Sequence, residues 1–214
     1  MVPSPVTIFF GLVLFAAVGV ITAGVAFFVL TREDLGPAGA CRNALTGEER
    51  PVQRDVAYAE TFQQTWNSVA SQIEAGATEV TLGFSESEVT SRAAAYLDER
   101  DAPLDNLVIC FHDGLAEARA DIEVPGASGL PVIGGLFDTT VRVTGTLDLA
   151  SEHPRLVLTD LDAGSLPGFI EDELRGDVEQ EINYRLAGLT IRYNYTSLVF
   201  TEGAATITAT AFVP

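Results

Sequence analysis

The stretch 80-VTLGFSESEV-89 joins a strand directly to a helix and decides the fold. Its apolar residues alternate with small or polar ones up to Phe84, which predicts a strand with one buried face. Ser85 and Glu88 have the spacing of a capping box, in which each side chain bonds the backbone of the other. A helix is therefore expected to begin immediately after the strand and to run through Leu97.

An amphipathic helix is predicted before this unit. Its apolar residues recur at intervals of three and four, which places them on one helical face, and Gly76 ends the pattern. The residues of this face are Val56, Ala59, Phe62, Trp66, Val69, Ala70 and Ile73.

Four strands are predicted after the second helix. Residues 107–111 form a short apolar run, and Asp113-Gly114 is a strong hairpin signal. Alternation over residues 116–124 then predicts one core face and one face in water. The second face carries Glu117, Arg119, Asp121 and Glu123. Two further alternating runs, at 141–149 and 156–161, complete a meander.

A third helix is predicted from Leu166 through Ile182, with apolar residues every four positions from Ile170. Two final strands are expected at residues 189–195 and 205–211, joined by a turn at Glu202-Gly203. The fold class that follows is α+β, with a curved antiparallel sheet gripping one or two helices in a helix-grip arrangement.

The N-terminal region predicts a membrane anchor. Residues 5–30 contain no ionisable side chain, and a helix of that length spans roughly 39 Å against a hydrocarbon core of about 30 Å. A cleaved signal peptide is the alternative, because residues 38–40 have the small-x-small form of a cleavage site. The apolar run is long for that alternative, and no Lys or Arg precedes it.

The two cysteines bear on the side of the membrane. A bridge between Cys41 and Cys110 would tie the segment after the anchor to a core strand, and would indicate an oxidising, extracytoplasmic compartment. Two unpaired buried thiols are the alternative. We expect a single-pass membrane protein whose domain lies outside the cytoplasm.

Composition excludes some functions. The formal net charge is -18 and every basic residue is Arg, so the surface should repel nucleic acid. His112 and His153 stand alone, and the cysteines lack metal-ligand spacing, so no metal site and no cofactor is predicted. No nucleophile, base and orienting group occur together, and we expect no catalytic residue and no enzymatic activity.

The connection at residues 124–137 is apolar and rich in glycine, where polar residues are usual. Such side chains should cover an apolar opening, dip into a membrane or pack as an ordinary buried crossover. For the first case, the residues expected at a cavity mouth are Leu130, Val132, Ile133 and Phe137.

Three short patterns carry a family resemblance. They are residues 80–89, the run 103-PLDNLVI-109 and the Asp113-Gly114 turn. Together with the element order over residues 78–212, they resemble small membrane-anchored bacterial envelope proteins that are similar to the tubular lipid-binding superfamily. The resemblance implies a long helix and a curved sheet that hold acyl chains between them. Helical faces then nominate the lining residues Val89, Ala93, Leu97, Phe169, Ile170, Leu174 and Ile182.

The sequence thus predicts three parts: an anchor with a short tail at 1–31, a linker and amphipathic helix at 32–76, and a helix-grip domain at 77–214. The amphipathic helix could belong to the domain or form a stalk. The expected function is binding of lipid or another apolar ligand by a membrane-tethered module. The alternative is a structural or interaction protein of the envelope with a closed core. The expected partners are the membrane, through residues 5–30, and a lipid; no particular protein partner is predicted.

Overall fold

A computed structural model describes residues 39–43, 45–99, 104–122, 139–149, 154–162, 168–187 and 193–211. Side chains are described in these ranges except at residues 104, 122, 139, 168–174, 177, 181 and 185. The fold is α+β with antiparallel sheets, as the sequence predicts. No helix in these ranges is long and apolar enough to cross a membrane, and the predicted anchor at residues 5–30 lies outside them.

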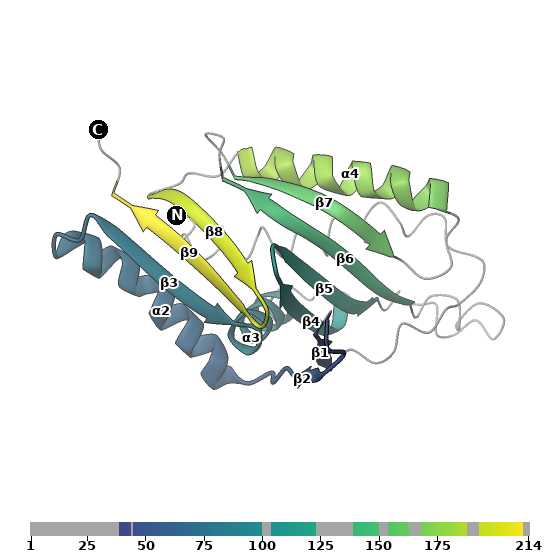
Figure 1. Cartoon of the computed structure of the whole chain (residues 1–214), viewed down its shortest axis with the longest axis horizontal. Helices are drawn as coiled ribbons and strands as arrows, with labels where there is room; N and C mark the ends of the chain where they lie inside the picture. Colours follow the sequence, from purple (N-terminus) through teal and green to yellow (C-terminus); the bar gives the residue numbers. More distant parts are fainter. Residues whose placement is uncertain are drawn as a thin grey trace.

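The helices and strands follow one another in the predicted order, with two short strands added at the start (Figure 1). These two strands fall in the segment predicted to be a linker. The bounds are β1 Ala40–Arg42, β2 Glu49–Pro51, α2 Val56–Glu74, β3 Glu79–Ser85, α3 Glu86–Asp98, β4 Leu104–His112, β5 Leu115–Ile122, β6 Thr139–Asp148, β7 Arg155–Asp162, α4 Gly168–Ala187, β8 Asn194–Thr201 and β9 Ala204–Thr210.

The strands form two principal sheets, so the prediction of one continuous curved sheet is wrong on this point. One sheet has the order β4-β5-β6-β7 and the other has the order β3-β9-β8, while β1 pairs with β2. All the pairings are antiparallel. The two principal sheets lie side by side in Figure 1, with β8 on the side that faces the four-stranded sheet.

The two sheets meet at the tips of two hairpins. The backbone N–H of Gly114, in the β4–β5 turn, donates to the carbonyl of Phe200 at 3.0 Å. The backbone N–H of Gly203, in the β8–β9 turn, donates to the carbonyl of Phe111 at 3.1 Å. Both glycines have φ near +80°, a conformation that a side chain would strain. Because these bonds come from turns and not from a ladder, the two sheets join only locally and remain separate.

The unit that decided the fold is confirmed in detail. Burial alternates along β3, with Val80, Leu82 and Phe84 inside. The hydroxyl of Ser85 accepts from the backbone N–H of Glu88 at 3.3 Å, and the Ser85 N–H donates to the Glu88 carboxylate at 2.7 Å. This capping box starts α3 at the residue after the strand ends.

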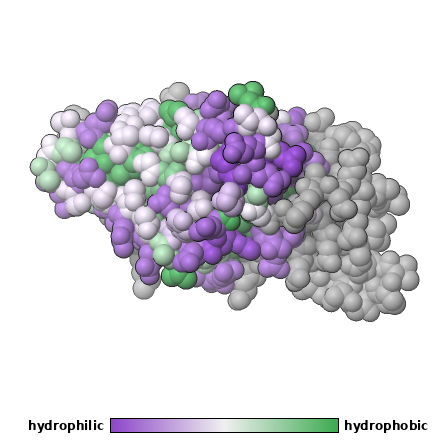
Figure 2. Space-filling model, turned by 60° about the horizontal axis from the view of Figure 1, so that its bottom comes forward, coloured by the Kyte–Doolittle hydropathy of each residue, from purple (hydrophilic) through white to green (hydrophobic). Residues whose placement is uncertain are grey.

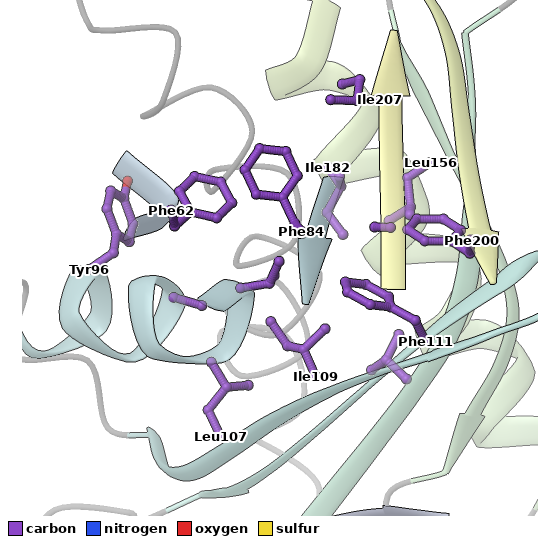
Figure 3. Close-up of a cluster of buried hydrophobic side chains, with 14 of the residues drawn as sticks. Phe62, Phe84, Tyr96, Leu107, Ile109, Phe111, Leu156, Ile182, Phe200 and Ile207 are labelled. Atoms are coloured by element: carbon purple, nitrogen blue, oxygen red, sulfur yellow. The ribbon is translucent and has the colours of Figure 1, made fainter. Parts of the chain in front are cut away.

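One apolar core joins all the main elements. Phe62 and Trp66 on α2 stack at 6.0 Å, and Phe62 lies 4.4 Å from the ring of Phe84. Figure 3 shows side chains from α2, α3, α4 and both sheets directed toward this shared interior. Helix α2 is therefore part of the folded domain and does not form a stalk.

The prediction that one face of β5 lies in water is wrong, because residues 40–55 cover the corresponding face of β4 and β5. Both faces of β4 are buried. Val108 and Cys110 face away from the main core and pack with Cys41 and Val52. On the neighbouring strand, Arg119 donates to the carbonyl of Ala40 at 2.6 Å and pairs with Glu117 at 3.0 Å. Strand β1 therefore covers this face.

The last helix and strands differ from the prediction in their bounds. Helix α4 extends to Ala187, about one turn beyond Ile182, and Val178, Ile182 and Leu186 are buried at the predicted four-residue interval. Strand β8 begins at Asn194, and residues 188–192, which include much of the strand predicted there, lie outside the described residues.

Candidate functional site

The segment from β1 to Asp55 forms a strap across the domain, and we call residues 40–55 the strap. A disulfide bond joins Cys41 in the strap to Cys110 in β4. Both cysteines are fully buried. The sequence left this pairing open, and the bridge fixes the chain that leads from residue 39 to the middle of a core strand.

Arg50 connects the strap to three other elements. Its guanidinium donates to both carboxylate oxygens of Glu86 on α3, at 2.7 and 3.2 Å, and to Glu202 in the β8–β9 turn. It also donates to the carbonyl of Phe111 on β4 at 3.3 Å. Hydrogen bonding to Glu86 raises the pKa of Arg50, so the guanidinium stays charged. Arg50 thus holds the strap, α3 and both sheets together at the point where the hairpin tips meet.

Polar side chains of α3 close the free edge of β4. The Phe111 N–H donates to Glu86 at 2.8 Å, and the Ile109 N–H donates to the hydroxyl of Thr90 at 2.9 Å. Residues four apart on a helix are separated by about 6 Å, close to the spacing of about 7 Å between alternate strand residues. The helix therefore supplies the acceptors that a neighbouring strand would otherwise provide.

The adjacent stripe of α3 holds the strap. The N–H groups of Gln53 and Asp55 donate to the hydroxyls of Ser87 and Ser91, each at 3.1 Å. Ser91 also donates to the carbonyl of Gln53 at 3.2 Å. The sequence signal was present, because the polar pairs 86–87 and 90–91 repeat after four residues in this helix. The sequence assigns Ser85 and Glu88 to the cap of this helix and predicts no role for the two polar pairs.

Thr90→Val is expected to lower the free energy of unfolding by about 2 kcal/mol. Valine keeps the shape of threonine but leaves the buried N–H of Ile109 without an acceptor. Thr90→Ser keeps the hydroxyl and should cost only about 1 kcal/mol, for the lost methyl group. Hydrogen exchange at the Ile109 amide provides the specific measurement. Equal exchange rates in the two variants would contradict this role of Thr90.

Helix α4 closes the opposite edge of the same sheet in the same way. The side-chain amide of Asn183 accepts from the N–H of Leu156 at 2.8 Å and donates to its carbonyl at 2.9 Å. Glu179 accepts from the N–H of Leu158 at 3.0 Å. Both edges of the four-stranded sheet are therefore capped by helices, which hinders unwanted strand pairing.

The predicted lining residues fall into two groups. Val89, Ala93, Leu97 and Ile182 are buried within the common core. The side chains of Phe169, Ile170 and Leu174 lie outside the described residues, although their backbone belongs to α4. The predicted cavity mouth, at Leu130, Val132, Ile133 and Phe137, also lies outside them.

Several apolar residues on the strands of both sheets are only partly buried, and the sequence analysis did not identify them as a group. Ala116, Ala118 and Leu147 lie on the four-stranded sheet, and Tyr195 and Leu198 lie on β8. Each packs against the core and yet remains partly exposed. We call these five residues the rim. The sequence predicts Ala116, Ala118, Leu147 and Tyr195 within alternating strands, whereas Leu198 lies beyond the strand predicted at residues 189–195.

Tyr195 extends the rim to α2. Its ring centroid lies 5.9 Å from that of Trp66. Burial, together with the nearby Tyr193, raises the pKa of Tyr195 to about 12. The hydroxyl consequently stays protonated at physiological pH and can donate a hydrogen bond.

Cys41, Glu86 and Cys110 bring possible metal-ligand atoms within 4.8 Å of one another. The disulfide bond occupies both thiols, and Arg50 occupies the carboxylate. In this arrangement the three residues tie the strap to the domain. No protein-family model matches this chain, and no curated protein is significantly similar to it.

Proposed function

We propose that the chain is a non-enzymatic, membrane-tethered, extracytoplasmic module that binds lipid or another apolar ligand. The ligand enters between the two sheets at the rim, and its acyl chains reach the apolar interior beneath. In this proposal residues 5–30 form the anchor, and the domain is an acidic helix-grip module similar to the tubular lipid-binding superfamily.

The rim is the observation that carries this proposal. Water contacts Ala118, Leu147 and Leu198 although each also touches the main core. An acyl chain that covered such residues would gain about 0.8 kcal/mol for each buried methylene group. The sheets meet at hairpin tips and not along a ladder, so separating them elsewhere breaks no strand pairing.

The disulfide bond supports the extracytoplasmic side. Such bonds persist in oxidising compartments and are rare in the cytosol. The net charge of -18 gives no support to a nucleic-acid partner.

A closed envelope protein that acts through protein contacts is the second candidate. It is favoured by the complete burial of Val89, Ala93 and Ile182, three residues nominated as a lipid lining. In that case the interior is a packed core, and the rim contacts a protein.

Fluorescence of Trp66 distinguishes the two candidates. Trp66 is the single tryptophan of the chain, is 4% exposed, and neighbours the rim residue Tyr195. Bromine atoms on an acyl chain quench tryptophan at contact distance. We therefore expect lipids with dibrominated acyl chains, added to the full chain in dodecyl maltoside micelles, to quench Trp66. Native mass spectrometry after purification should also find bound lipid. An unquenched Trp66 and a lipid-free mass would favour the closed protein.

Ala118→Phe is expected to weaken lipid binding about ten-fold, because the larger ring fills the proposed entry. Thr146→Phe is the matched control, since Thr146 lies on the opposite face of the same sheet and pairs with Val157. Thermal unfolding by circular dichroism checks that both variants fold. Equal quenching of Trp66 in the two variants would place the ligand elsewhere.

A further inference from the structure

The tripeptide Asn194-Tyr195-Thr196, at the start of β8, has the form of an N-glycosylation sequon. A sequon consists of an acceptor asparagine and a hydroxyl residue two positions later. In the whole sequence, this is the only asparagine that Ser or Thr follows at that spacing. Three residues match by chance in many chains, so the structural setting decides whether this match has a function.

Both residues that the sequon requires are exposed. Asn194 and Thr196 lie at the surface, whereas Tyr195 between them packs against the core. Thr196 is the extra residue of a β-bulge, because Tyr195 pairs with Ala209 and Ser197 pairs with the preceding residue of β9. Among the described residues, neither the Asn194 side-chain amide nor the Thr196 hydroxyl has a hydrogen-bond partner. A modification of Asn194 therefore disrupts no side-chain bond there.

The surroundings are poor in charge, although the chain is strongly acidic. Strands β8 and β9 contain no Asp, Glu, Arg or Lys. In Figure 2 purple hydrophilic residues cover the middle of the molecule, whereas the end that carries the three-stranded sheet and α2 is paler. Helices cap both edges of the four-stranded sheet, but β8 is an edge strand of the other sheet. A hydrated glycan on β8 would hinder unwanted strand pairing where charges do not.

We propose that Asn194 is an N-glycosylation site that accepts an oligosaccharide from a polyprenyl-diphosphate-linked donor. The amide nitrogen of Asn194 forms a bond to the anomeric carbon of the first sugar. The bond from that carbon to the donor phosphate breaks, the polyprenyl diphosphate leaves, and an amide proton passes to a base of the transferase. This inference uses the extracytoplasmic side of the proposed function, which the disulfide bond supports, and does not require lipid binding.

Trypsin isolates the site, because it cleaves after Arg192 and no Arg or Lys follows in the sequence. The full chain is purified from the membranes of its native cells, and free thiols are alkylated before digestion. Mass spectrometry then reports both the peptide that begins at Tyr193 and the state of the two cysteines. Thr196→Val removes the hydroxyl and keeps the side-chain shape. Thr196→Ser is the matched control, because serine also satisfies the sequon.

We expect a sugar mass on Asn194 in the unmodified sequence and in Thr196→Ser, and none in Thr196→Val. A bare peptide from a chain whose cysteines are bridged would overturn the inference and leave the extracytoplasmic placement intact. A bare peptide together with two alkylated cysteines would overturn both. A sugar mass that persists in Thr196→Val would show that Asn194 is not the acceptor.

Discussion

Replacing Cys41 and Cys110 together by alanine is expected to lower the free energy of unfolding by about 4 kcal/mol. The bridge closes a loop between residues 69 positions apart, and the chain-entropy model gives a value of about this size for such a loop. The bridge also holds Cys41 against Val108, so its loss should release the strap from β4.

Urea unfolding followed through Trp66 fluorescence measures this effect, because Trp66 is buried in the stack with Phe62. Reductant should destabilise the unmodified chain by a similar amount and leave the double variant unchanged. A double variant as stable as the oxidised chain would show that the strap is held by Arg50 and the serines of α3 without help from the bridge.

Glu86→Ala is expected to cost about 3 kcal/mol of unfolding free energy. The carboxylate is 7% exposed and accepts from Arg50 and from the N–H of Phe111. Its removal leaves a buried N–H without an acceptor and takes a partner from a guanidinium that is 26% exposed. Arg50 keeps Glu202, which limits the loss.

Two further variants separate charge from hydrogen bonding. Glu86→Gln retains an acceptor for Phe111 and should cost about half as much. Glu79→Ala, at an exposed position at the start of β3, should change stability by less than about 0.5 kcal/mol. If Glu86→Ala and Glu79→Ala had the same effect on the urea midpoint, the network at Arg50 would have no stabilising role.

Local patterns predicted most of the fold. The capping box at Ser85 and the alternation that ends at Phe84 are properties of neighbouring residues, and both are confirmed. The element order from α2 to β9 is confirmed for the same reason, since apolar periodicity and turn residues specify each element separately.

Features that depend on distant residues could not be predicted in this way. The strap lies on β4 because Cys41 and Arg50 find partners at residues 110 and 86, and no local pattern encodes those contacts. In the helical pattern, Ser87 and Thr90 are ordinary polar positions. Their hydroxyls nevertheless accept hydrogen bonds from backbone N–H groups of residues distant in sequence, Gln53 and Ile109. The division into two sheets likewise depends on pairings between strands distant in sequence, such as β3 with β9.

The bridge also sets the route of mechanical tension through the molecule. A pull applied between residue 39 and the C-terminus passes from Cys41 across the sulfur atoms directly to Cys110. Residues 42–109, which include α2, β3 and α3, then lie in a covalent loop that the pull does not stretch. Under load, the strands from β5 onward would extend first. Strand β3 would then lose its pairing with β9, while Phe62, Trp66 and Phe84 would remain inside the covalent loop.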